Sequence, residues 1–128
     1  MKAGDLRHRV IVEKVAYSEE TDANGNVQEL RQTASVEAAH YRTLRGGETV
    51  QQARLEGRQV LVITVRANKV TRTIRPDWRL IDARDGRLFE ITAPIVETED
   101  RRWVEITCTD TGEGVELSTF DPETLVVT

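Results

Sequence analysis

Residues 59–67 of the 128-residue chain read QVLVITVRA, and this stretch gives the strongest strand signal in the sequence. Its side chains form two alternating sets: Val60, Val62, Thr64 and Arg66 in one, and Leu61, Ile63 and Val65 in the other. Alternate residues of a strand point to opposite faces, so both faces of this strand are nearly apolar. β-Branched residues also favour a strand over a helix. The stretch therefore predicts a central strand of a sheet or barrel.

Apolar runs on both sides of this stretch predict further strands, at residues 6–15, 35–44, 70–74, 78–83, 88–96 and 103–109. In the first of these, Leu6, His8, Val10 and Val12 share one face. Asp85-Gly86 lies between two apolar runs and is a strong signal for a hairpin turn. Residues 17–34 are polar and contain the turn dipeptide Asn24-Gly25, so we expect a long loop or a flexible hairpin there.

Residues 48–56 form the one segment that predicts a helix, because they contain good helix formers, an acid in the first turn and Gly57 as a C-terminal stop. Gly46-Gly47 interrupts the chain before it. Together these segments predict a mainly β protein: a small antiparallel β-barrel of about six to seven strands with one short α-helix and long polar loops. We expect the barrel domain to span residues 1–110 and a C-terminal extension to span residues 111–128.

The net charge of −4 hides an uneven distribution. Residues 54–87 contain nine Lys or Arg and four Asp or Glu, whereas residues 97–128 contain two Arg and nine acids. Such a chain has either two solvated faces or two faces that pair head to tail with other copies. The chain has no apolar run long enough for a membrane helix and no signal peptide at its start, so we expect a soluble protein made inside the cell.

No motif in the sequence predicts catalysis, a metal ion or a cofactor. His8 and His40 are the two histidines, and we expect both to be structural, with His8 partly buried. The single cysteine, Cys108, lies on an apolar strand face and predicts a buried, inert thiol. The stretch TDANGNV fails the calcium-loop pattern, since Thr33 stands where the bidentate Glu is needed. The Gly-rich stretches lack the lysine of a phosphate cradle.

Binding of single-stranded nucleic acid is an alternative, because a small barrel with a basic middle can be an OB-type fold. Such folds stack bases on aromatic side chains. Only six aromatic residues are present, and they do not cluster on one face: Tyr17, Tyr41, Trp78, Phe89, Trp103 and Phe120.

The order of the segments is similar to that of a known family. The opening GDLRHRVIVEK contributes Gly4, Leu6, Arg7, His8, Arg9 and Val10, and the polar segment contributes Asp22, Asn24 and Gly25. The middle contributes Ala39, Leu44, Gly46, Glu48, VLVITVRA with Arg66, and TRTIRPDWRL. The last part contributes Gly86, Arg87, Phe89, Ile91 and WVEITCT. Over residues 4–110 the chain thus resembles the phage head–tail joining family, also called head closure, stopper or head–tail adaptor proteins, which gene transfer agents share.

The resemblance implies a small β-barrel without enzymatic activity that forms a homo-oligomeric ring at the head–tail junction of a phage or gene transfer agent particle assembled in the bacterial cytoplasm. It implies three kinds of partner: the portal-adaptor ring protein, a tail terminator or tail tube protein, and packaged double-stranded DNA in the channel without sequence-specific contacts. It implies no membrane partner. A neighbouring tail-completion protein is a further alternative. We expect subunit or adaptor contacts from Arg7, Arg9, Arg66, Arg72, Arg75 and Arg79, and a lumen or gating loop at Arg45, Gly46, Gly47 and Glu48.

Overall fold

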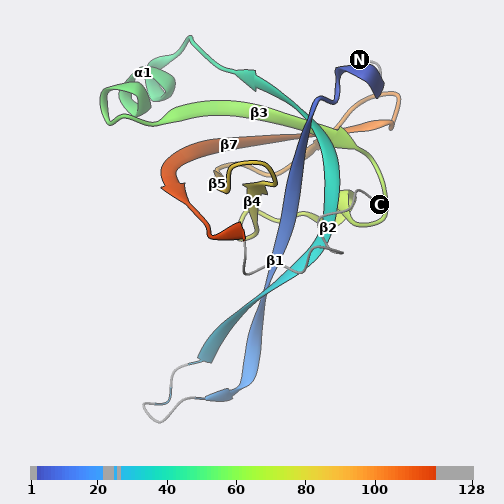
Figure 1. Ribbon diagram of the computed structural model, residues 1–128, viewed down its shortest axis with the longest axis vertical. Coiled ribbons are helices and arrows are strands. Elements are labelled where there is room, and N and C mark those ends of the chain that lie inside the picture. The colour runs from blue at the N-terminus through green and yellow to red at the C-terminus, as the bar shows by residue number, and fades with distance from the viewer. Residues whose placement is uncertain (1–2, 22–24, 26, 118–128) are drawn as a thin grey trace.

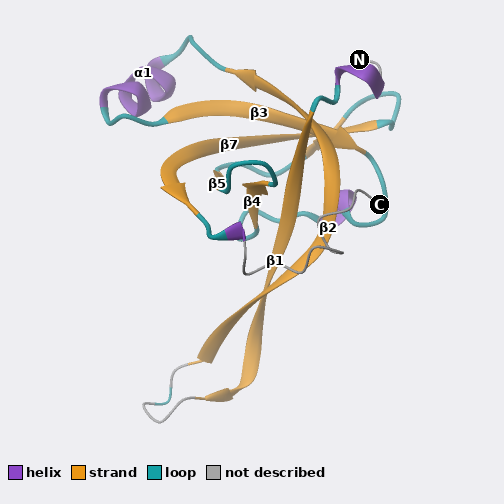
Figure 2. Cartoon of the chain, viewed as in Figure 1, coloured by secondary structure: helices purple, strands orange, loops and turns teal. Residues whose placement is uncertain are grey.

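Six strands close into an antiparallel barrel, and a seventh, short strand extends it (Figures 1 and 2). The computed structural model describes residues 3–21, 25 and 27–117. The strands are β1 (His8–Thr21), β2 (Val27–Thr43), β3 (Gln59–Arg66), β4 (Arg79–Asp82), β5 (Arg87–Ile91), β6 (Val96–Glu97) and β7 (Trp103–Gly114). The helices are η1 (Ala3–Asp5), α1 (Glu48–Leu55) and η2 (Thr71–Thr73). The order around the barrel is β1-β2-β3-β7-β5-β4, with β6 added to β7. The predicted fold class is confirmed.

The interior of the barrel is filled by one of the two alternating sets of each strand. In β3 these are Leu61, Ile63 and Val65, and in β7 they are Val104, Ile106 and Cys108. Phe89 supplies the largest fully buried side chain. β3 pairs with β2 on one side and with β7 on the other, and the side chains on both of its faces are buried from Val60 to Val65, which explains why it is apolar along that length.

A second, smaller cluster lies on the outside of the barrel and is covered by the end of the described chain. It consists of Ile11, Val36, Ile81 and Leu88, with Val115 and Leu117 packed against it. The backbone N–H of Val115 donates a hydrogen bond of 2.7 Å to the carbonyl of Gly86. β7 itself runs past residue 110 to Gly114; the division of the chain at residues 110 and 111 stays a prediction.

The two longest strands, β1 and β2, form a ribbon that projects beyond the barrel (Figure 1). β4 pairs only with Val10–Glu13 of β1, and β3 pairs only with Ala39–Thr43 of β2. Beyond those points the described parts of β1 and β2 pair with each other alone. We call Val15–Thr21 of β1 and Val27–Leu30 of β2 the arm. The expected long loop at residues 17–34 is therefore wrong, and the alternative, a hairpin, is correct; a two-stranded ribbon needs no buried face, so its sequence lacks the alternation that marks a strand.

Two other strand predictions also change. Residues 70–74 do not continue the sheet but form η2, because the side-chain Oδ1 of Asn68 accepts hydrogen bonds from the backbone N–H groups of Val70 and Thr71, both at 2.9 Å. The predicted strand at residues 88–96 is divided into β5 and β6, and Pro94, which has no N–H to donate, lies between them. The hairpin at Asp85-Gly86 is confirmed as the β4–β5 pair.

The predicted helix is confirmed as α1 and ends in a Schellman motif. The N–H of Gly57 bonds to the carbonyl of Arg54, and the N–H of Arg58 bonds to that of Ala53. Gly57 has φ of 78°, a left-handed conformation that a side chain would strain. α1 contacts β3, and its Val50 is buried. None of the helices in the described part of the chain combines the length and hydropathy that crossing a membrane requires.

Candidate functional site

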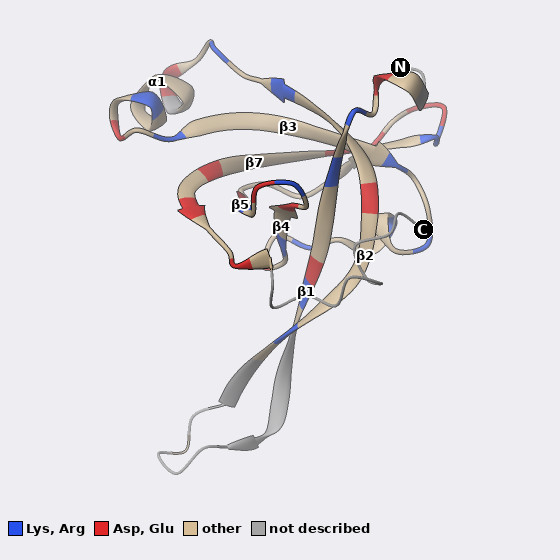
Figure 3. Cartoon of the chain, viewed as in Figure 1, with Lys and Arg blue, Asp and Glu red and all other residues tan. Residues whose placement is uncertain are grey.

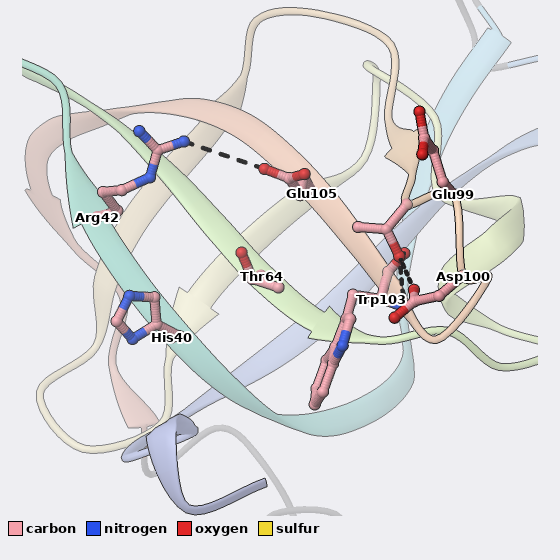
Figure 4. Close-up of a pocket in the computed structure, with 8 residues that line it drawn as sticks. His40, Arg42, Thr64, Glu99, Asp100, Trp103 and Glu105 are labelled. Atoms are coloured by element: carbon pink, nitrogen blue, oxygen red, sulfur yellow. Dashed lines mark hydrogen bonds and ion pairs between the residues drawn. The ribbon is translucent and has the colours of Figure 1, made fainter. Parts of the chain in front are cut away.

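A surface pocket of about 500 Å³ lies on the outer side of β2, β3 and β7, next to the turn that leads into β7 (Figure 4). β2 supplies His40 and Arg42, β3 supplies Thr64, and β7 supplies Trp103 and Glu105. The turn before β7 completes the lining with Thr98, Glu99 and Asp100. The lining residues on β2, β3 and β7 belong to the alternating set that faces away from the barrel interior, so the pocket lies on the outside of the barrel.

The charges of this pocket are mixed and exposed. Arg42 Nη2 lies 4.0 Å from Glu105 Oε2, with both side chains more than a third exposed, so this ion pair contributes little to stability. The Thr98 hydroxyl donates to Asp100 Oδ1 at 2.6 Å, and the Arg102 N–H donates to the same oxygen at 3.1 Å. These two bonds lower the pKa of Asp100. The described residues contain no group of three His, Cys, Asp or Glu side chains placed to hold a metal ion. The pocket is thus a polar surface hollow with charges of both signs.

A buried polar network ties β2 to the β4–β5 hairpin. The hydroxyl of Tyr41 donates a 2.7 Å hydrogen bond to Asp82, whose exposed fraction is only 2%. Burial and this carboxylate raise the pKa of Tyr41 above its ordinary value. Arg87 Nη2 lies 3.6 Å from the same carboxylate, while its Nε donates to Asp85 at 2.9 Å. No sequence signal indicated this network, because Tyr41 and Asp82 are 41 positions apart.

The two histidines have structural contacts, as expected. The ring of His8 stacks on that of Tyr41, with centroids 4.1 Å apart and planes at 4°. His8 is nevertheless exposed rather than partly buried. His40 Nδ1 lies 3.3 Å from the Asp5 carbonyl. Cys108 is fully buried, as predicted, and burial raises the pKa of its thiol to about 12.

The predicted contact arginines do not form one cluster. Arg7 and Arg9 are exposed near the start of β1. Arg66, at the end of β3, and Arg75, after η2, are also exposed. These two belong to one continuous stretch, residues 66–75, which forms the end of β3 and the segment around η2.

Arg72 and Arg79, by contrast, have acid partners within the chain. Arg72 Nε donates to Glu97 Oε1 at 3.0 Å. Arg79 Nε donates to Glu13, a carboxylate that is 5% exposed, and Arg31 Nη1 lies 3.9 Å from the same oxygen. Removing one partner of such a buried pair leaves a charge without compensation. Arg79 thus stabilises the junction of β1 with β4 from within.

The predicted lumen loop lies between β2 and α1. Arg45, Gly46, Gly47 and Glu48 are all exposed, and Gly47 precedes α1 with φ of 92°. Arg45 and Arg54 line a second, smaller pocket together with Thr43, Leu44 and Gln59. The loop is therefore a surface feature at the α1 corner of the barrel (Figure 1).

Charges of both signs are interspersed over the described elements (Figure 3). Lys and Arg positions occur on α1, β1 and the turns, and Asp and Glu positions occur beside them and on β7. A channel for single-stranded nucleic acid needs a continuous basic groove with aromatic platforms. The described part of the chain shows charges of both signs interspersed along its elements.

The model of the phage head completion protein family matches residues 1–111 of the chain. The chain belongs to this family. Head completion proteins are structural parts of the virion, so this protein is a virion component that assembles with other virion proteins, and it is not an enzyme. The resemblance found in the sequence is thereby confirmed.

Two solved structures are similar to this fold. The solution structure of protein SF1141 from Shigella flexneri 2a has a TM-score of 0.62 and 20% sequence identity, and the match covers 88% of this chain and 99% of that one. A chain in the virion of a native gene transfer agent (GTA) particle has a TM-score of 0.53 and 22% identity, over 81% of this chain and 93% of that one. Comparison with curated proteins finds no match.

Proposed function

We propose that this head completion protein is a connector subunit at the head–tail junction, where copies form a ring between the portal-adaptor ring and the tail. The observation that carries the proposal is the family match over residues 1–111. The similarity to a chain of a gene transfer agent virion supports it. In this role the ring closes the exit for packaged double-stranded DNA and presents the docking surface for a tail terminator or tail tube protein. Assembly takes place in the bacterial cytoplasm.

The structure supports a role in assembly in two ways. First, the fold offers unlike surfaces, among them the arm, which projects beyond the barrel (Figure 1), and the exposed bases of residues 66–75. A closed ring of identical subunits needs such a pair of unlike surfaces, because each subunit meets its neighbour head to tail. Second, the exposed loop Arg45–Glu48 is a candidate for the lumen, since its side chains are not used in the barrel.

The contact residues of the proposal are Arg7, Arg9, Arg66, Arg72 and Arg75. We assign Arg79 to the stability of the barrel instead, because it pairs with buried Glu13. Charge reversal of Arg66 and Arg75 together should abolish joining of heads to tails without lowering the melting temperature. A matched control is the reversal of Arg54 and Arg58, which are located at the α1 corner.

The deciding experiment is to produce particles without this protein. We expect heads that lose their DNA and do not attach tails, and electron microscopy of complete particles should place the protein at the junction. DNA-filled, tailed particles in its absence would refute the proposal. Density for the protein at the tail rather than next to the portal would assign it instead to tail completion.

A further inference from the structure

Two short segments of the chain each contain charged residues of one sign only, and the two signs are opposite. The described residues of the arm include three acids (Glu19, Glu20 and Glu29) and no Lys or Arg. Residues 66–75 contain four bases (Arg66, Lys69, Arg72 and Arg75) and no acid. We call residues 66–75 the basic segment. The residues around α1 carry less net positive charge than the basic segment, because Glu48 and Glu56 lie among their arginines.

The basic segment is held in one shape by the fold. The Asn68 side chain fixes η2 from within and also donates to Glu37, and the Thr71 hydroxyl donates to the Arg66 carbonyl at 2.7 Å. Ile74 anchors the segment in the barrel core. Its charged side chains are exposed: Arg66, Lys69, Arg72 and Arg75. Of these, Arg72 is paired with Glu97, whereas Arg66, Lys69 and Arg75 make no ion pair with any described acid.

Within the described part of the chain, the strands of the arm pair with no other strand of the barrel. The two strands pair only with each other over the described residues, so each has a free edge, and the arm runs away from the barrel (Figure 1). An isolated two-stranded ribbon is marginally stable in water at best. Leu30, at the barrel side of the arm, is 45% exposed and is one of three exposed large apolar side chains among the described residues, with Leu55 and Val96. A surface that covers the arm would bury Leu30 and pair the free edges.

We propose that the arm of one copy docks on the basic segment of a neighbouring copy. This inference rests on the ring of the proposed function and names the contact that joins its subunits. The arm and the basic segment are different surfaces of the same chain, so the contact is head to tail and propagates around a ring. Complementary charge steers the two surfaces together and sets which neighbour is accepted.

The chain is well suited to a cross-linking test, because its one cysteine, Cys108, is fully buried and we expect it not to react in the folded protein. We would introduce Gln28→Cys in the arm and Lys69→Cys in the basic segment, supply this chain to particles made without the native protein, and add a short bis-maleimide. We expect a ladder of cross-linked products that contain only this chain. The matched control combines Gln28→Cys with Arg54→Cys on α1 and should give no ladder. Absence of the ladder, an equal ladder in the control, or a product with a different virion protein would overturn the proposal.

Charge exchange gives an independent measurement. Glu19→Lys with Glu20→Lys, or Arg66→Glu with Arg75→Glu, should each lower the number of copies incorporated per particle on the order of tenfold, because attraction becomes repulsion at two pairs. A chain with all four changes should recover incorporation, and Arg54→Glu with Arg58→Glu should not lower it. If the fourfold variant melts at the native temperature but incorporates no better than the pairs, the proposal is wrong. If the arm does not dock on the basic segment but particles still need the protein to retain DNA, this contact is wrong and the proposed function stands. If particles without the protein are normal, the proposed function itself is refuted.

Discussion

Replacing Gly86 with alanine should release the end of the described chain from the barrel. Gly86 has φ of 80°, and a Cβ atom there would lie 2.3 Å from the carbonyl oxygen of Val115. A side chain at Gly86 would therefore strain the left-handed backbone and would also clash with the carbonyl oxygen of Val115. The matched control is Gly112, which has φ of 77° but no neighbouring atom within 4 Å of the point that a Cβ would occupy.

The cost can be divided into three parts. Left-handed strain costs about 1 kcal/mol at either glycine. At Gly86, loss of the 2.7 Å hydrogen bond from Val115 adds about 1 kcal/mol. Exposure of the half-buried Val115 and Leu117 side chains adds about 1 kcal/mol more. We therefore expect Gly86→Ala to destabilise the protein by about 3 kcal/mol and to lower its melting temperature by about 12 °C, against about 4 °C for Gly112→Ala.

Thermal unfolding followed by circular dichroism measures both variants. A second pair of measurements isolates the clash: in a chain truncated after Gly114, the obstructing carbonyl of Val115 is gone, so Gly86→Ala should cost only the strain and match Gly112→Ala. Equal melting temperatures for the two variants in the full chain, or an undiminished effect of Gly86→Ala in the truncated chain, would refute the reasoning.

Three further outcomes are expected. Because burial and Asp82 raise the pKa of Tyr41, the folded state keeps the phenol proton at pH values where the unfolded chain, with a pKa of about 10, loses it. Stability from this group is complete below about pH 10 and is lost as the pH rises; urea unfolding at pH 8 and 11 should show a steep decline that Tyr41→Phe lacks, and parallel declines would contradict this. Arg79→Ala should cost about 3 kcal/mol in the same assay, since it deprives buried Glu13 of its closest cation, and a cost below about 0.5 kcal/mol, typical of surface positions, would mean that the pair contributes nothing. Cys108 should react with a thiol reagent at pH 8 only after unfolding, because burial raises its pKa to about 12; fast reaction of the folded protein would show that the barrel opens there.

The alternation of apolar residues was sufficient to predict the strands whose two faces differ or are both buried. QVLVITVRA predicted β3 and WVEITCT predicted β7, because each has a face in the barrel interior. Asp85-Gly86 predicted the β4–β5 hairpin through the conformational preference of its glycine. The order of these segments was enough to indicate the family, since a fold with the same order of elements preserves the spacing of its short motifs.

What the sequence left open depends on contacts between residues far apart in the chain. At the arm the sequence left a loop and a hairpin open, because residues 17–34 lack the alternation of apolar residues that marks a strand with one buried face. Residues 70–74 resembled a strand, but the Asn68 side chain competes for their backbone N–H groups and turns them into η2. The arginines were equivalent in the sequence; the tertiary structure separated Arg79, which compensates buried Glu13, from Arg66 and Arg75, which remain exposed. Local patterns thus determined most of the strands, whereas closure of the barrel decided which charged side chains pair inside the fold and which remain exposed.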